Sequence, residues 1–170
     1  LLQILGTLAQ SDKGSIEINN QAIHHLNAKN LPAFRNREIG FIFQAHQLLP
    51  EFSALENVCL PNWILQGSKK DAEKYAKKIL LDLGLQHRLN HKPMELSGGE
   101  QQRVAVARAL INNPSVILAD EPSGNLDTDN AKKLHELFFE LRERYNQTFV
   151  IVTHNPELAE MSDRILEIKD

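Results

Sequence analysis

Short runs of consecutive apolar residues alternate with longer amphipathic stretches along most of this chain. The runs have the length and the β-branched or aromatic content of strands buried on both faces, and they lie at 39–43, 115–119, 148–152 and near 164–168. The amphipathic stretches repeat apolar residues at helical spacing, and they lie at 71–83, 98–112, about 128–145 and after Asn155-Pro156. Strands that alternate with helices in this way predict an α/β fold with a mostly parallel sheet.

The beginning and the middle of the chain have other patterns. Apolar residues at positions 1, 4, 5 and 8 fit one face of a helix, and residues 14–21 alternate as an antiparallel hairpin does. After Gln44 the chain leaves the sheet for a mostly helical segment. We therefore expect one domain, with an α/β core of residues 1–44 and 113–170 and a helical subdomain of residues 45–112.

Composition narrows the possible functions. The net charge is −3 with a pI near 6.2, and no basic stripe is visible, so we expect no nucleic-acid partner. A single cysteine, Cys59, excludes an internal disulfide framework and suits a reducing compartment. No run approaches the roughly 18 apolar residues of a membrane span. Any role at a membrane is therefore expected to act through a partner.

The first candidate site is the turn from Ser97 to Glu100. These two residues form an S-x-x-E capping box at the start of the 98–112 helix. Gly98 and Gly99 stand between them, so no bulky side chain covers the free backbone N–H groups. A helix start of this kind binds anions, phosphate above all. In isolation the same residues also fit a well-capped surface helix.

A second candidate site follows the buried strands. Asp120 and Glu121 come at the end of the 115–119 run, and Gln44 and His154 follow two other runs. In α/β sheets the ligand crevice lies at this edge, where one acid can hold Mg²⁺ and another can polarise an attacking water. Two acids alone also fit a core strand that ends in a solvated turn.

The order of these motifs is more specific than any one of them. F-Q, then L-S-G-G-E-Q-Q-R, then an apolar run ending in D-E-P, then S-G-N-L-D and T-H, resembles the ATP-binding cassette (ABC) ATPases. The resemblance covers nearly the whole chain and implies a RecA-like P-loop NTPase core that binds ATP and Mg²⁺. It implies that Asp120 orients Mg²⁺, Glu121 is the general base for water, Gln44 senses Mg²⁺ or water, and His154 contacts the γ-phosphate.

The resemblance also implies a second copy of the subunit. ATP is then sandwiched between the Walker motifs of one copy and the L-S-G-G-E turn of the other. Ser97 and Gly99, with Gly98 and Glu100 in the same turn, would bind the γ-phosphate in the opposite site, and Asp127 would couple the two sites.

One family motif has no counterpart here. The Walker A loop cradles phosphates with backbone N–H groups and a lysine, and no glycine in the early part of the chain precedes a Lys-Ser or Lys-Thr pair. We expect a fragment whose N-terminal strands and phosphate loop are missing, and which does not hydrolyse ATP by itself. The alternative is a natural relative without the loop.

Residues 44–58 indicate which subgroup of the ABC ATPases this chain resembles. They resemble the F-Q-x-x-x-L-L-P-E-F run of lipoprotein-releasing transporter ATPases, within a wider group that includes macrolide-exporter and cell-division ATPases. This resemblance implies a peripheral subunit at the cytoplasmic face of a bacterial inner membrane. Integral-membrane subunits would dock around Leu48–Trp63. Two alternatives are a signalling or scaffold module of the cell-division type and an inactive remnant.

Overall fold

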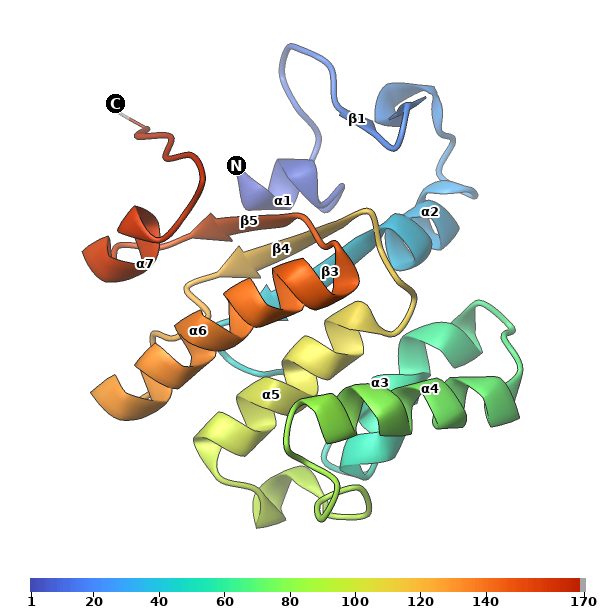
Figure 1. Cartoon of the computed structure of the whole chain (residues 1–170). Coiled ribbons are helices and arrows are strands. Elements are labelled where there is room, and N and C mark those ends of the chain that lie inside the picture. The colour runs from blue at the N-terminus through green and yellow to red at the C-terminus, as the bar shows by residue number, and fades with distance from the viewer. Residues whose placement is uncertain (169–170) are drawn as a thin grey trace.

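The computed structural model describes residues 1–168, and its centre is a parallel sheet (Figure 1). The sheet order is β3 (Ile39–Phe43), β4 (Val116–Asp120) and β5 (Phe149–Val152). Ile39 of β3 is opposite Val116 of β4, and Asp120 of β4 is opposite Val152 of β5. All three strands run in the same direction. The expected parallel α/β fold is therefore confirmed.

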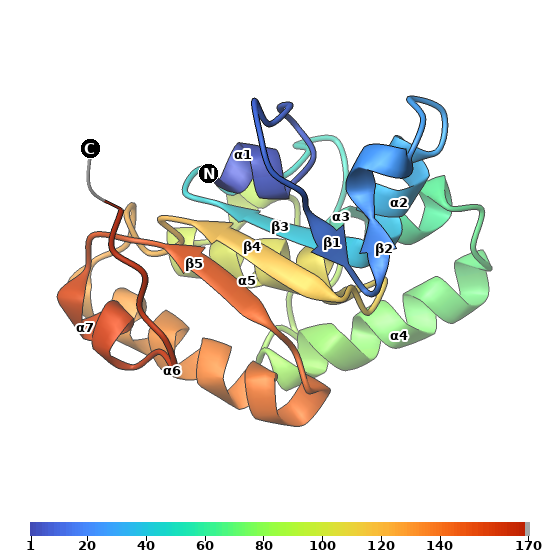
Figure 2. The ribbon, with the colours of Figure 1, turned by 90° about the horizontal axis from the view of Figure 1, so that it is seen from above.

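Helices and a small hairpin surround this sheet on both faces (Figures 1 and 2). The hairpin consists of β1 (Glu17–Ile18) and β2 (Gln21–Ala22). The helices are α1 (Leu2–Leu5), α2 (Leu31–Glu38), α3 (Ala54–Ile64), α4 (Lys69–Asp82), α5 (Gly98–Leu110), α6 (Thr128–Tyr145) and α7 (Pro156–Glu160). Short 3₁₀ turns lie at Ile23–His25 and Pro93–Glu95.

Alternation along the strands assigns side chains to the two faces. On one face, Ile39 and Leu118 are buried together with Phe34 of α2, beneath α1, α2 and the hairpin. On the other, Ile42 and Ile117 belong to the larger core that α5 and α6 close. A Cβ on Gly40 would lie 2.6 Å from the carbonyl oxygen of Ala109. Glycine at this position therefore lets α5 approach β3 closely.

The segment between β3 and β4 is helical, as expected. Helices α3, α4 and α5 pack together around buried residues such as Val58, Ile79 and Val104. Cys59 is buried in α3, and burial raises the pKa of its thiol to about 12. None of the helices in the described residues has the length and apolar character that a membrane crossing requires.

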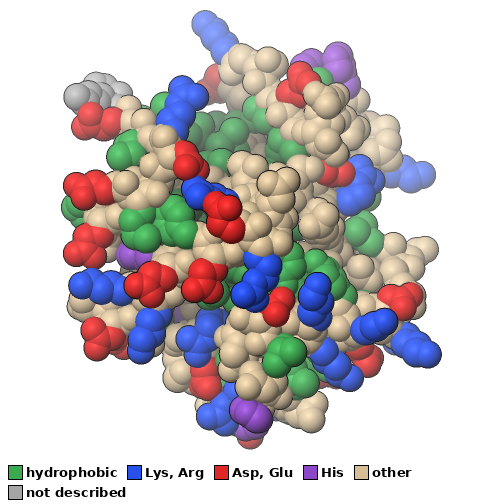
Figure 3. Space-filling model, in the orientation of Figure 1, with side chains coloured by type: hydrophobic (Ala, Val, Ile, Leu, Met, Phe, Trp, Pro, Cys, Tyr) green, Lys and Arg blue, Asp and Glu red, His purple; other side chains and the backbone are tan. Residues whose placement is uncertain are grey.

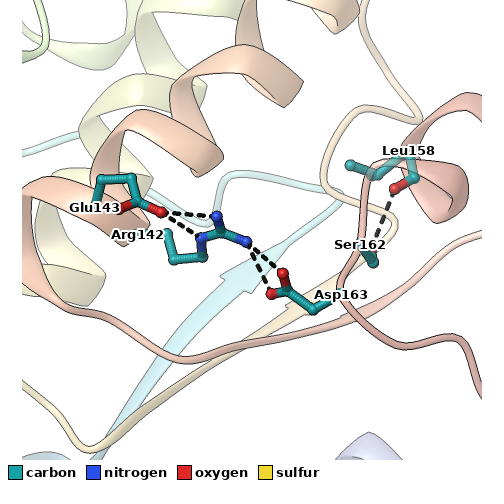
Figure 4. A network of polar contacts seen from close by, with 5 residues as sticks. All are labelled: Arg142, Glu143, Leu158, Ser162 and Asp163. Atoms are coloured by element: carbon teal, nitrogen blue, oxygen red, sulfur yellow. Dashed lines mark hydrogen bonds and ion pairs between the residues drawn. The ribbon is translucent and has the colours of Figure 1, made fainter.

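Capping residues define both ends of helix α6: Asp127 at its start and Asn146 at its end. Asp127 accepts a hydrogen bond from the amide of Asn130 at 2.9 Å, and Asn146 closes the helix in the left-handed conformation. Near this end, Arg142 donates to both carboxylate oxygens of Asp163, at 2.9 and 2.8 Å (Figure 4). This contact ties the segment after α7 to α6.

Two predictions of elements need correction. The strand near 164–168 was wrong: these residues form no strand, and Ile165, Leu166 and Ile168 are exposed. The opening helix is shorter than the apolar positions 1–8 indicated, because it ends at Leu5 before Gly6 and the left-handed Thr7. Lys169 and Asp170 lie outside the described residues.

Candidate functional site

The three central strands end at one edge of the sheet, and this edge carries the candidate residues Gln44, Asp120, Glu121 and His154. Because Phe43, Asp120 and Val152 are opposite one another in the register, Gln44, Glu121 and Thr153 follow at the same level. Asp120 is exposed there. This is the position at which parallel α/β sheets bind ligands.

Glu121 is held by the residues that follow β5. Its carboxylate accepts a hydrogen bond from the backbone N–H of His154 at 2.9 Å and one from the Thr153 hydroxyl at 3.3 Å. The Nδ1 atom of His154 lies 2.8 Å from the same carboxylate. The Glu121 side chain is 16% exposed and the His154 imidazole is 89% exposed. The carboxylate is therefore held in place by its hydrogen bonds, while the histidine ring faces solvent.

The backbone of Glu121 is also unusual. Its φ is +42°, in the left-handed region that non-glycine residues seldom adopt, and its N–H donates to the carbonyl of Val152 at 2.9 Å. Such strain persists only where the surroundings enforce it, and it concentrates at functional sites.

Gln44 contacts the segment after Glu121. Its side-chain amide donates to Asn125 at 3.3 Å, and the Asn125 amide donates back to the Gln44 carbonyl at 2.9 Å. A Cβ on Gly124 would lie 2.7 Å from Nε2 of Gln44. The 121–125 segment therefore packs directly against the residue that ends β3.

The turn at Ser97 is a complete capping box. The Ser97 oxygen accepts from the Glu100 amide, and the Glu100 carboxylate accepts from the Ser97 amide at 2.8 Å and from Arg88 at 2.9 Å. The bond from the Ser97 amide is the main reason that the pKa of Glu100 lies below its usual value, and Arg88 adds to it. Glu100 therefore shapes the turn through both carboxylate oxygens.

The Ser97 turn and the Asp127 turn are neighbours. A Cβ on Gly99 would lie 3.3 Å from the Asn130 side chain, and Asn130 is the partner of Asp127. The hydrogen bond from the backbone N–H of Asn130 is the main reason that the pKa of Asp127 lies below its usual value. The structure thus brings together Gly99 and the start of α6, and separately brings together Gln44, Glu121 and His154.

The donors at the sheet edge fit a magnesium nucleotide in part. No group of three metal-binding His, Cys, Asp or Glu side chains occurs among residues 1–168. Mg²⁺ does not need such a cage, because it keeps waters and takes phosphate oxygens beside one or two protein ligands. The exposed Asp120 carboxylate and the Gln44 amide are oxygen donors of that kind. The lysine and amide cradle of a Walker A loop is not part of these residues.

Sequence reasoning missed several residues that support this edge. Thr153 and Asn125 stood inside motifs but were not assigned a contact. Gln102 was also missed, because nothing in the local sequence marked it as a buried position. It is fully buried, donates to the carbonyl of Pro122 at 2.7 Å, and contacts His46.

Comparison with known proteins gives consistent matches. The family described as ABC transporter matches residues 1–124. The lipoprotein-releasing system ATP-binding protein LolD of Cytophaga hutchinsonii is 60% identical over all of this chain and 78% of its own length. LolD of Bacteroides thetaiotaomicron is 58% identical over the same shares.

Solved structures match as well. The dimeric post-hydrolysis state of the ATP-binding cassette MJ0796, bound to ADP and Pi, superposes with a TM-score of 0.80 at 41% identity. The match covers 93% of this chain and 70% of that one. A second dimeric structure of MJ0796, described as a bacterial ABC transporter cassette, gives the same score and identity.

Proposed function

This chain belongs to the ABC transporter family and is an ATPase of that family, and we propose that it is the ATP-hydrolysing subunit of a bacterial lipoprotein-releasing transporter. The observation that carries the proposal is identity of 60% over the whole chain with a relative of that name. The proposed place of the subunit is the cytoplasmic face of the inner membrane, where it is bound to integral-membrane subunits.

The residues at the sheet edge have distinct proposed roles. Glu121 accepts a proton from the attacking water, and the donors from Thr153 and His154 hold its carboxylate in place. His154 presents an exposed imidazole for the γ-phosphate. Asp120 and Gln44 would hold Mg²⁺, which when bound neutralises charge on the phosphate oxygens.

The turn at Ser97 serves the site of a second copy in this proposal. Support comes from a helix start whose Gly98 and Gly99 carry no side chain to cover the backbone N–H groups. Glu100 keeps the turn in shape, and Asp127 lies at the neighbouring start of α6. Binding of ATP between two copies would place both turns at the interface.

The surface proposed for the membrane subunits lies around Leu48–Trp63. Leu48, Leu55 and Trp63 pack against the core, so they are poor candidates for contact with a partner. Leu49 is 45% exposed and Ile64 is 72% exposed. Ile64 lines a hollow of about 400 Å³ between α2, β3, α3 and α5, which also includes Phe43 and Gln47. We place the docking surface at this hollow and at Leu49.

The test is reconstitution of the full-length protein with its membrane subunits in lipoprotein-loaded vesicles. We expect ATP-dependent release of lipoprotein, and we expect Ile64→Asp to reduce it strongly by placing a charge in an apolar contact. Leu81→Asp is the matched control, because Leu81 is also an exposed branched aliphatic residue, at 56%, but lies on α4 outside the hollow. ATP hydrolysis without lipoprotein release would contradict the transport proposal, and equal loss in both variants would contradict the surface.

Charge does not single out another partner. Acidic and basic side chains are interspersed over the face seen in Figure 3. A non-hydrolytic scaffold or signalling module of the cell-division type would release no lipoprotein, so the same vesicle assay separates it from the proposed transporter.

A further inference from the structure

Gln102 is a buried amide that touches two loops of the sheet edge. It stands in the first half of α5 with no exposed surface. Its Nε2 donates to the carbonyl of Pro122 at 2.7 Å, and its Oε1 contacts Nδ1 of His46. Pro122 follows Glu121 directly, and His46 lies two residues after Gln44.

The chemistry of the partners fixes the direction of both bonds. A proline carbonyl can only accept, so the NH₂ group of Gln102 must face Pro122. The amide oxygen then faces the imidazole, and Nδ1 of His46 must carry a proton and donate it. The result is a continuous chain of hydrogen bonds from His46 through Gln102 to Pro122. In it the Gln102 oxygen accepts and the Gln102 NH₂ group donates.

Further contacts hold the two loops on either side of this bridge. From the end of α5, Arg108 donates to the carbonyls of Gln47 at 2.6 Å and His46 at 2.9 Å. Beyond Pro122, the Ser123 hydroxyl lies 2.9 Å from Nε2 of the buried His135. Helix α5 therefore contacts the loop after Gln44 through both Gln102 and Arg108. Gln102 also contacts the turn after Glu121.

We propose that Gln102 is a positioning residue of the ATPase site, which fixes the turn after Glu121 relative to the loop after Gln44. The proposal rests on the ATP hydrolysis proposed above. Gln102 would contact neither nucleotide nor metal, and would act through the backbone next to Glu121. A displacement of about 1 Å of a catalytic group can lower a rate about a hundredfold.

A second glutamine allows the positioning role to be separated from a structural one. Gln147 is also buried, and its Nε2 donates to a proline carbonyl, that of Pro114, at 2.9 Å. Pro114 precedes β4 and Pro122 follows it. The two bonds are therefore alike in chemistry but lie at opposite ends of one strand.

The experiment compares Gln102→Leu with Gln147→Leu in the full-length protein assembled with its membrane subunits. Both replacements fill similar volume and leave a proline carbonyl unpaired, so we expect similar losses in melting temperature. Only Gln102→Leu is expected to lower kcat, by about tenfold with KM for ATP nearly unchanged. Equal kcat loss in both variants, or unchanged kcat in Gln102→Leu, would overturn the proposal.

Substitutions at His46 test the other end of the bridge. His46→Leu removes the donor and is expected to lower kcat, whereas His46→Asn keeps an N–H group near the same place and is expected to restore part of it. If both residues act through one contact, His46→Leu adds little to Gln102→Leu, and fully additive losses would count against the bridge.

A spectroscopic measurement keeps this inference separate from the proposed function. Nitrogen NMR of labelled histidine is expected to show a proton on Nδ1 of His46, and a changed signal in Gln102→Leu. If the assembled wild-type complex hydrolyses ATP but releases no lipoprotein, the transport proposal fails while the kcat comparison still decides the role of Gln102. A wild type without ATPase activity overturns both, and NMR then reports whether the bridge itself exists.

Discussion

At the amino end of β4, polar groups pair with one another away from solvent, whereas at its carboxyl end one acid is exposed and the next has a strained backbone. The Pro114 carbonyl accepts from Gln147, and the Ser115 hydroxyl donates to Glu38 at 2.5 Å. At the other end, Asp120 is exposed and Glu121 has a φ of +42°. The two ends of this five-residue strand therefore differ in how their polar groups are bonded and how far these are exposed to solvent.

The difference shows how a single strand can serve both stability and chemistry. Buried, fully bonded groups at the amino end stabilise the fold, because each would cost free energy if left unpaired. Groups at the carboxyl end have to remain available for a ligand. We expect substitutions at one end to change stability and substitutions at the other to change activity.

The largest expected effect is at Glu121. In the full-length protein, Glu121→Gln keeps the shape of the side chain but removes the proton acceptor, so turnover is expected to fall by about 10²–10⁴. Phosphate release measures turnover, and ATP binding by calorimetry is expected to persist. A variant that hydrolyses ATP at the wild-type rate would show that Glu121 is not the base.

The next effect concerns the pairing of two copies. In the Glu121→Gln background, ATP is expected to produce a dimer on gel filtration. Adding Ser97→Arg is expected to abolish it, because arginine has no acceptor for the Glu100 amide and fills the anion site. Ser68→Arg is the control, since the Ser68 oxygen also accepts a hydrogen bond from the backbone N–H three residues later, that of Asp71 in α4. Loss of the dimer in both variants would mean that a damaged cap alone explains it.

A smaller effect is expected at the amino end. Burial raises the pKa of Glu38, but hydrogen bonds from Ser115, Arg37 and Asn19 outweigh it, so the folded pKa lies below 4.5. A lowered folded pKa stabilises the protein above the unfolded value and loses this contribution as the pH falls through the folded value. Glu38→Gln is expected to lower the free energy of unfolding by about 1–3 kcal/mol at pH 7, and by less below about pH 4.

Denaturant unfolding at several pH values measures this effect, and ATPase activity is its control. Under conditions where the variant remains folded, we expect its turnover to stay near that of wild type. A large loss of turnover at constant stability would contradict the division between the two ends of β4.

The smallest effect is expected at Gly124. A Cβ in Gly124→Ala would lie 2.7 Å from Nε2 of Gln44 and would push aside the end of a flexible side chain. Turnover is expected to fall a few-fold, equivalent to about 1 kcal/mol, with little change in melting temperature. Gly84→Ala is expected to give the opposite pattern, because Gly84 follows α4 in the helical segment and has a φ of +71°, where a side chain strains the backbone and reduces stability alone.

Local sequence carried most of the information about regular elements. The run 39–43 has the bounds of β3, and α6 spans 128–145 because Asp127 and Asn146 both mark its ends. The 164–168 run misled because a strand needs a neighbouring strand, and apolar content does not reveal whether one is paired. Helix α2 was not predicted because its apolar residues stand together in its first half and do not form a clear apolar face.

The candidate site was predictable as a set of motifs but not as a network. The positions of Gln44, Glu121 and His154 at strand ends followed from the pattern of apolar runs. The contacts of Gln102 with residues 20 and 56 positions away did not. Nor did the left-handed conformation of Glu121, which depends on how β5 and its following loop fix the backbone.

The conformation of Glu121 has a consequence for engineering. Glycine adopts a positive φ without the steric strain of a side chain, so Glu121→Gly relieves this strain but also removes the acceptor of the Thr153 and His154 hydrogen bonds. The same change removes the carboxylate proposed as the base. A library screened only for heat tolerance would therefore balance backbone strain against these hydrogen bonds without regard to the base, whereas a screen for turnover would retain the carboxylate in spite of its strained backbone.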